Sequence, residues 1–166
     1  MNTKNKIVSL QNLKKIAARS RRKGLKIAFT NGCFDILHSG HVSYLEAAKR
    51  DGRLLIVGLN SDASVRRIKG RERPIVPQKH RAGVMAALGC VDYIVIFSED
   101  TPQKTIEALQ PDILIKGADW KGQYVAGQDA VEARGGKVEF IKYLPGFSTT
   151  NIIESIFKKC QTLDKK

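Results

Sequence analysis

Two histidines placed three residues apart are the feature of this sequence with the clearest chemical use. His38 and His41 are two of the chain's three histidines, and they close the segment TNGCFDILHSGH, residues 30–41. Side chains three residues apart lie on the same side of a helix. With Ser39 as the N-cap, both rings would lie at the amino end of a helix, where unpaired N–H groups and the helix dipole attract anions. The spacing therefore predicts a site for a phosphate group.

A metal site is the alternative use of the same pair. Two histidines could ligate zinc, but the sequence offers no evident third ligand and lacks the HExxH pattern. Gly40 removes a side chain where a phosphate must come close, and Gly32 opens the preceding strand end in the same way. We therefore expect a phosphate cradle, with no metal held by fixed protein ligands.

Short apolar segments alternate with segments of helical periodicity along the chain. The apolar segments, expected to be strands, span residues 26–31, 53–60, 91–97, 112–116 and 138–141. Helices are expected around Leu10 to Ala17, over 39–50, from Ser61 or Asp62 to Arg67, through Met85 and Leu88, after Thr101 as N-cap, over 125–134, and from Ser148. Continuously apolar strands indicate a parallel sheet covered on both faces. The sequence thus predicts a single α/β domain with a doubly wound, Rossmann-like sheet of five parallel strands.

Ligands of such sheets bind beyond the carboxyl ends of the strands. Those ends are expected at Thr30 to Gly32, Asn60 to Asp62, Phe97 to Glu99 and Lys116 to Asp119. The last helix would add hydroxyl and N–H donors at Ser148 to Thr150. We expect its apolar side, formed by Ile152, Ile153, Ile156 and Phe157, to be buried. A phosphorylated ligand is therefore predicted at this edge.

Composition narrows the class of protein. No apolar run approaches the ~20 residues that span a bilayer, and the first residues lack a signal peptide, so we expect a cytoplasmic protein without a membrane partner. The three cysteines are widely spaced, which argues against a disulfide scaffold. We divide the chain into a basic leading helix (1–24), a main domain (25–157) and a basic tail (158–166).

The formal charge of +13 suits anionic partners. Nucleotide triphosphates and sugar phosphates meet that condition, and so do nucleic acids. A nucleic-acid-binding domain without catalysis therefore remains an alternative, although aromatic residues make up only 7% and no nucleic-acid motif is present, so nucleic acid is not the expected partner.

The segment TNGCFDILHSGH resembles the cytidylyltransferase-like nucleotidyltransferases, whose signature is HxGH. Further stretches resemble one branch of that family, the adenylyltransferases of ADP-heptose synthesis: residues 60–64, Lys69-Gly70 with Arg73-Pro74, Arg81, 111–117 and 147–153. The resemblance covers residues 25–157. One departure is Gly-Ala-Asp-Trp at 117–120, where the branch more often has Gly-Gly-Asp-Tyr; the Asp-Trp pair is closer to glycerol-3-phosphate cytidylyltransferases.

The resemblance implies an activity. AMP would pass from ATP to D-glycero-β-D-manno-heptose 1-phosphate, giving ADP-heptose, a precursor of the lipopolysaccharide core, and pyrophosphate. Mg²⁺ would enter with ATP, a separate heptose 7-phosphate kinase would act in the same pathway, and the protein would form a homo-oligomer, a dimer or larger. The alternative within the family is transfer from CTP to glycerol 3-phosphate.

The resemblance also assigns roles to residues. The expected catalytic residues are His38, His41, Lys69 and Arg81. The expected nucleotide contacts are Thr30, Asn31, Gly32, Phe34, Gly40, His41, Lys116, Gly117, Asp119, Ser148, Thr149 and Thr150, and the expected substrate contacts are Asp35, Asn60, Asp62 and Arg73. Asp35 would orient either its loop or a metal-bound water, and Trp120 would either stack on the base or pack.

Overall fold

Helices and strands alternate along the chain, as the sequence predicts. The structure, a computed structural model, describes residues 3–144 and 146–163. Its elements are η1 (Thr3–Lys6), α1 (Leu10–Arg22), β1 (Lys26–Gly32), α2 (Ser39–Ala48), β2 (Arg53–Asn60), α3 (Asp62–Lys69), α4 (Gln78–Ala87), β3 (Tyr93–Phe97), α5 (Gln103–Leu109), β4 (Ile113–Gly117), η2 (Ala118–Trp120), α6 (Gln128–Glu132), β5 (Lys137–Ile141) and α7 (Thr149–Leu163).

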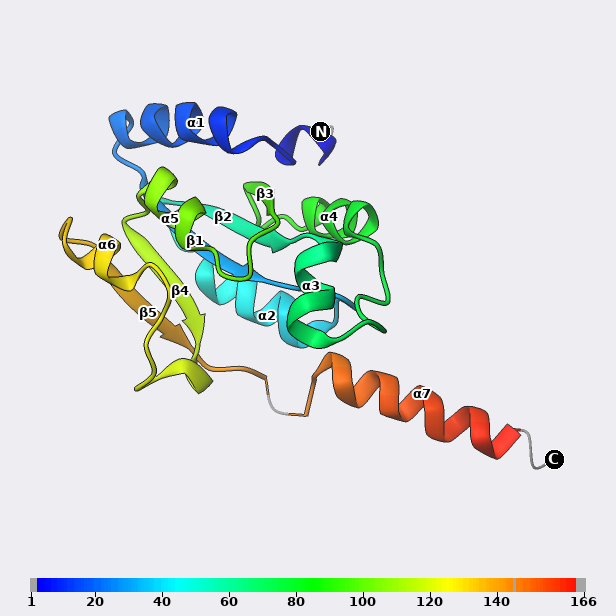
Figure 1. The fold of residues 1–166 in the computed structure, drawn as a ribbon. Coiled ribbons are helices and arrows are strands. Elements are labelled where there is room, and N and C mark those ends of the chain that lie inside the picture. The colour runs from blue at the N-terminus through cyan, green and yellow to red at the C-terminus, as the bar shows by residue number, and fades with distance from the viewer. Residues whose placement is uncertain (1–2, 145, 164–166) are drawn as a thin grey trace.

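The strands form one five-stranded parallel sheet in the order β3-β2-β1-β4-β5 (Figure 1). The chain therefore winds outward from β1 to β3, then returns to the other side of β1 for β4 and β5. This is the doubly wound arrangement, and the predicted fold class is confirmed. The reversal leaves a crevice at the carboxyl ends of β1 and β4, which is where such sheets bind ligands.

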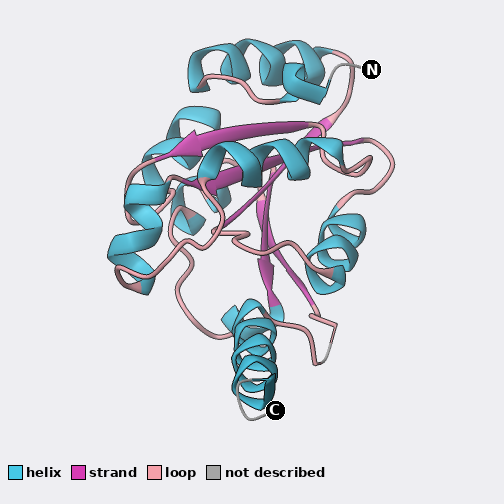
Figure 2. Cartoon of the chain, turned by 90° about the vertical axis from the view of Figure 1, so that its right-hand side faces the viewer, coloured by secondary structure: helices cyan, strands magenta, loops and turns pink. Residues whose placement is uncertain are grey.

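Helices lie on both faces of the sheet (Figure 2). Each face has its own apolar layer. Along β1, Ile27 and Phe29 pack with α1, α5 and α6, whereas Ala28 between them packs with α2 and α4. This alternation follows from the period of two in a strand. The leading helix α1 belongs to the same layered body, because Leu13 and Ala17 are buried in it.

Several predicted helix boundaries need correction. His38, in extended conformation, is the N-cap residue of α2, and Ser39 is its first helical residue. Likewise α5 begins at Gln103 with Pro102 before it, so Thr101 lies outside the helix. Ser61 does cap α3, since its side chain accepts a hydrogen bond from the Ser64 N–H.

The last helix, α7, was wrongly predicted to be buried. It points away from the sheet and its helices in Figure 1, and none of its residues is buried. Ile156 is 55% exposed and Phe157 is 63% exposed, while Ile152 and Ile153 are half-buried. The spacing identified the apolar side of the helix correctly, but within residues 3–144 and 146–163 nothing buries Ile156 or Phe157. The boundary expected at residues 157 and 158 falls inside this helix.

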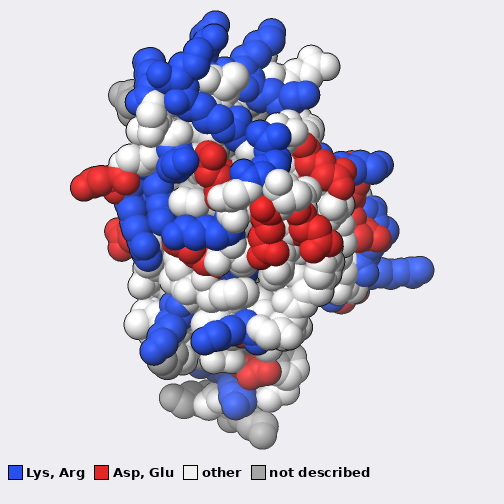
Figure 3. All heavy atoms as spheres, turned by 90° about the vertical axis from the view of Figure 1, so that its left-hand side faces the viewer, with Lys and Arg blue, Asp and Glu red and all other residues white. Residues whose placement is uncertain are grey.

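Positive charge gathers on α1, where Lys14, Lys15, Arg19, Arg22 and Lys23 lie on or next to the helix (Figure 3). Three arginines are in its last turn, where cations complement the helix dipole. Among the described residues, no helix combines the length and apolar character that crossing a bilayer requires.

Candidate active site

A cavity of about 730 Å³ lies at the carboxyl ends of the strands. Twelve of the predicted site residues line it: Asn31, Gly32, Phe34, His41, Asn60, Lys69, Arg73, Lys116, Gly117, Asp119, Thr149 and Thr150. They come from the ends of β1, β2 and β4 and the residues that follow β1 and β4, from the first turn of α2, from the end of α3 and the loop after it, and from the first turn of α7. The topology therefore brings together residues more than 100 positions apart, as the carboxyl-end rule predicts.

The two histidines form a stacked pair. Their ring centroids are 3.8 Å apart, with 28° between the ring planes, so the spacing argument placed them correctly on one side of the helix start. The Nδ1 atom of each ring is buried without a hydrogen-bond partner among the described residues. The Nε2 atoms are not among these buried, unpaired atoms, which leaves them as the ring nitrogens that a ligand can reach.

Burial keeps both imidazoles neutral near pH 7. It lowers the pKa of His38, and burial together with the neighbouring His38 lowers the pKa of His41 to about 4. A neutral imidazole still has one N–H to donate. The pair can therefore offer hydrogen bonds to an incoming anion without first being protonated, and an anion at the rings would favour their protonated forms.

Gly40 has a different neighbour from the one predicted. A Cβ on Gly40 would lie 3.0 Å from the His38 ring and 3.2 Å from Cβ of Phe147. The missing side chain thus makes room for the protein's own His38 and Phe147. The geometry at this position therefore does not match the expectation that Gly40 makes room for a phosphate. The backbone N–H groups at the start of the helix are still the hydrogen-bond donors available to an anion.

Phe34 holds the strand-to-helix turn in shape. Its φ of +44° is rare for a residue with a side chain, and its buried ring meets the edge of His41 with centroids 5.2 Å apart. A strained residue persists only where its surroundings fix it. Phe34 therefore packs against the His41 ring and also lines the cavity.

Arg81 was expected to clamp a phosphate, but it is fully buried. Its guanidinium donates to the carbonyl oxygens of Val76, Cys33 and Asn60 and to Oδ1 of Asp62, the last at 2.8 Å. These partners belong to three separate segments around the cavity. Arg81 therefore ties the segments together and lies outside the cavity lining. Asp62, which also accepts the Gln78 N–H, likewise stays outside the cavity lining.

Asp35 is also committed to the protein. Its carboxylate accepts hydrogen bonds from Arg73 Nε at 2.6 Å and from the N–H groups of Ile75 and Val76 at 2.9 and 2.8 Å. Burial alone would raise the pKa of Asp35, but these donors outweigh it and leave the pKa below its ordinary value. Of the two roles left open by the sequence, loop orientation is the one that the contacts support.

Lys116 and its neighbours form the opposite wall. Its Nζ donates to Oδ1 of Asn31 at 2.6 Å and lies 5.0 Å from the centroid of the Trp120 ring, within cation–π range. Burial lowers the pKa of Lys116 to about 8, against the opposing effect of Asp119. This wall thus combines a cation, a carboxylate and an aromatic face.

The seven predicted residues outside the lining are Thr30, Asp35, His38, Gly40, Asp62, Arg81 and Ser148. Most of them support lining residues; Ser148, for example, caps α7 by accepting the Asn151 N–H at 3.0 Å. Lining residues that the sequence reasoning missed include Tyr44, Asp100, Tyr124 and Tyr143. The carboxyl-end rule could have found Tyr143, which follows β5, had it been applied to the fifth strand.

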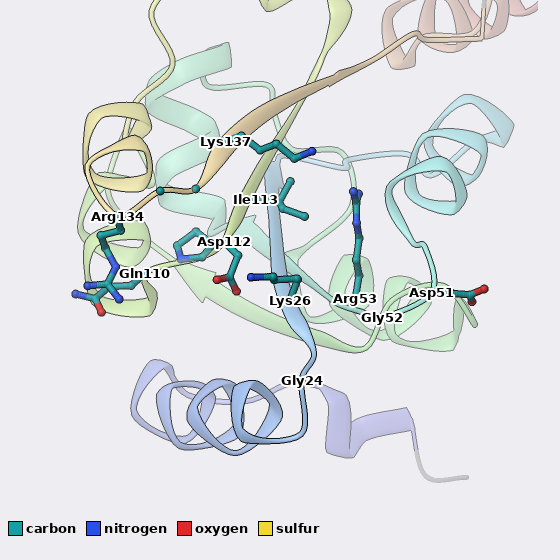
Figure 4. Close-up of a pocket in the computed structure, with 13 residues that line it drawn as sticks. Gly24, Lys26, Asp51, Gly52, Arg53, Gln110, Asp112, Ile113, Arg134 and Lys137 are labelled. Atoms are coloured by element: carbon teal, nitrogen blue, oxygen red, sulfur yellow. The ribbon is translucent and has the colours of Figure 1, made fainter.

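A second hollow, of about 490 Å³, lies at the opposite end of the sheet (Figure 4). Two of the cations that line it, Arg53 and Lys137, already form ion pairs with Glu139. Asp112 there accepts the N–H of Ile27. Because it faces the amino ends of the strands, the rule for parallel sheets disfavours it as the active site. Among the described residues, no three His, Cys, Asp or Glu side chains group as a metal site.

A doubly wound sheet with paired imidazoles and cations at its carboxyl edge defines an α/β protein built to hold phosphates. The chain belongs to the cytidylyltransferase-like family, whose sequence model matches residues 29–155.

Relatives extend this comparison. The chain is 54% identical to the bifunctional protein HldE of Trichlorobacter lovleyi over 154 residues and 51% identical to that of Proteus mirabilis over 153. These matches cover 93% and 92% of this chain but 31% and 32% of the relatives, so the chain spans about a third of their length. A lipopolysaccharide core biosynthesis protein of Thermoplasma volcanium is 28% identical, with a TM-score of 0.57; the match covers 73% of this chain and 98% of that protein.

Proposed function

We propose that the protein is an adenylyltransferase that transfers AMP from ATP to D-glycero-β-D-manno-heptose 1-phosphate, releasing pyrophosphate and ADP-heptose. The observation that carries the proposal is the stacked histidine pair at a cavity whose rim also presents Lys69, Arg73 and Lys116. Family membership and the HldE relatives support the same reaction class.

The chemistry needs positioning more than proton transfer. A sugar 1-phosphate oxygen is already a nucleophile near pH 7, so no general base is required. It attacks the α-phosphorus of ATP in line, a new P–O bond forms, and the bond to pyrophosphate breaks. The catalytic problem is to hold two polyanions together and to stabilise charge at the α-phosphate.

His38 and His41 would donate hydrogen bonds to phosphate oxygens as that charge builds. One preorganised donor of this kind is worth about 3 kcal/mol, or about a hundredfold in rate. The first turn of α7 faces the same cavity and brings Thr149 and Thr150, together with the free N–H groups of a helix start. We assign the triphosphate to the space between these two helix starts.

The remaining cavity residues would divide between the two ligands. Lys69 and Arg73 lie on the side of α3 and the loop after it, where they would neutralise phosphate charge. Lys116, Asp119 and Trp120 would face the nucleoside. Arg81, Asp35 and Asp62 act in this proposal by fixing the loops that hold these groups.

Magnesium would arrive with ATP. The described residues offer no ready cluster of ligands, so Mg²⁺ would be held mainly by phosphate oxygens and water, as is common for this ion. When bound, it would offset negative charge on the triphosphate.

A second candidate is transfer of CMP from CTP to glycerol 3-phosphate. The Asp119-Trp120 pair favours it, because Trp120 borders the cavity beside Lys116. The identities of 51–54% to HldE proteins favour the heptose substrate.

Initial rates of pyrophosphate release separate the candidates. ATP and CTP would each be tested with heptose 1-phosphate and with glycerol 3-phosphate. We expect turnover with ATP and heptose 1-phosphate at least tenfold above every other pair. Turnover with CTP and glycerol 3-phosphate alone would replace the proposal by the second candidate.

The proposal also places the protein in its cellular setting. A separate kinase acting on heptose 7-phosphate would work in the same pathway, and the use of ATP implies a cytoplasmic enzyme. We further propose that the chain forms a homo-oligomer, which would cover the exposed apolar side of α7.

A further inference from the structure

Gly117, at the end of β4, faces an aromatic ring. A Cβ built on Gly117 would overlap the ring of Tyr143, well inside the 3.0 Å below which real Cβ atoms are not found. Both residues line the cavity. The absence of a side chain at position 117 is therefore explained by a neighbour within the protein, before any nucleotide is considered.

Tyr143 is held from a second side. Its ring stacks on Tyr44, with centroids 5.6 Å apart and 28° between the planes. The hydroxyl of the buried Tyr44 lies 2.8 Å from Oγ1 of Thr30, at the carboxyl end of β1. Burial raises the pKa of Tyr143 to about 12, and the charge and hydrogen bond of Asp119 act in the same direction. The ring is thus fixed between the ends of β1 and β4.

The segment after β5 leads from this ring to α7. It meets the body again at Phe147, whose Cβ would lie 3.2 Å from a Cβ on Gly40. Thr149 and Thr150 follow at once and line the cavity. The two residues that contact glycines, Tyr143 and Phe147, precede α7. Within α7 itself every described position is exposed or half-buried, so no buried residue of the helix anchors it.

We propose that Tyr143 is a positioning residue of the nucleotide site: seated on Gly117 and stacked on Tyr44, its ring sets where the first turn of α7 lies at the cavity. This inference rests on the proposed nucleotide transfer. In this proposal Gly117 makes room for the Tyr143 ring and does not contact the nucleotide. The effects of substitutions at the two positions are therefore predicted to be coupled.

A double-mutant cycle tests the coupling. The variants are Gly117→Ala, Tyr143→Ala and the double variant, with Gly89→Ala as control, because Gly89 is exposed outside the helices and a Cβ on it meets nothing within 4 Å. In the wild-type background, Gly117→Ala should lower the melting temperature by on the order of 5 °C through overpacking. In the Tyr143→Ala background the same change should have an effect as small as Gly89→Ala.

Kinetics test the positioning role. Gly117→Ala and Tyr143→Ala should each raise KM for ATP about tenfold or more, while kcat changes less, and the double variant should be no worse than Tyr143→Ala. Tyr143→Phe, which keeps the ring, should stay within about threefold of wild type.

Three results would overturn the inference. The first is an equal loss from Gly117→Ala in both backgrounds, which would return Gly117 to the ligand. The second is an unchanged KM in Tyr143→Ala. The third is Tyr143→Phe behaving like Tyr143→Ala. The melting temperatures report the coupling even if the wild-type protein turns over none of the proposed substrates, so failure of the proposed function is recognised separately.

Discussion

Among single residues, His38 and His41 contribute most to the proposed reaction, as hydrogen-bond donors to the phosphate. Replacing either His38 or His41 by asparagine removes one imidazole donor from the site. We expect kcat to fall about a hundredfold for each, with KM for ATP changed only a few-fold. Initial-rate measurements check this, with His80→Asn as the matched control, because His80 is exposed and outside the cavity. A kcat within threefold of wild type would remove the pair from the mechanism.

The depressed pKa of His41 has a consequence for stability. Its pKa is about 4 in the folded protein, against an ordinary value of 6.5. The unfolded chain therefore binds the proton more readily between these values, and stability that is complete above pH 6.5 is lost as the pH falls toward 4. Allowing for partial exposure, the loss should be on the order of 1–2 kcal/mol.

Urea unfolding at pH 7.5 and pH 4.5 measures this effect. His41→Gln should lose less stability than the wild-type protein between the two pH values. Equal losses in both proteins would contradict a neutral, buried His41.

At the scale of elements, Arg81 joins the loop before α2, the end of β2 and the loop before α4. Replacing it by methionine removes one donor from the carboxylate of Asp62, which keeps the Gln78 N–H, and removes the guanidinium donor from three carbonyl groups. Breaking a buried network of this kind costs about 3–5 kcal/mol. Chemical denaturation of Arg81→Met should show that loss, whereas Arg66→Met, at an exposed position, should stay within about 0.5 kcal/mol of wild type. A variant that is stable but inactive would instead give Arg81 a direct role with the ligand.

The strands and the cavity edge could be predicted from the sequence because both depend on local pattern. Runs of apolar residues indicated the parallel sheet, and the residues directly after each strand indicated the edge of the sheet at which ligands bind. The roles of Arg81 and Asp35 could not be predicted, because a cation or carboxylate in a loop has the same sequence signal whether it faces a ligand or a backbone group. Only the path of the loop after α3, folded back over Asp35, separates the two cases.

At the scale of the whole molecule, the exposed side of α7 is the main unsatisfied surface. Ile156, Phe157 and Leu163 are all more than half exposed, which is unusual for a contiguous apolar stripe. If a second copy covers it, Phe157→Glu should dissociate the oligomer, whereas Lys158→Glu, on the opposite side of the helix, should not. Light scattering after size exclusion measures the mass directly. A wild-type protein that is monomeric at 100 µM would contradict the proposed oligomer.

The basic surface of α1 bears on the alternative of nucleic-acid binding. The helix carries its cations on the surface shown in Figure 3, while the cavity lining includes none of its residues. Exposed cations in the last turn stabilise the helix whether or not a polyanion binds. The charge of α1 therefore does not by itself require a nucleic-acid partner.

In the proposed complex the triphosphate lies between the histidine pair and the start of α7. A crystal structure with a non-hydrolysable ATP analogue would show its position. We expect phosphate oxygens within hydrogen-bond distance of His38 or His41 and of Thr149 or Thr150, with the base toward Lys116 and Trp120. A nucleotide bound in the hollow at the amino ends of the strands, with both imidazoles left free, would contradict it.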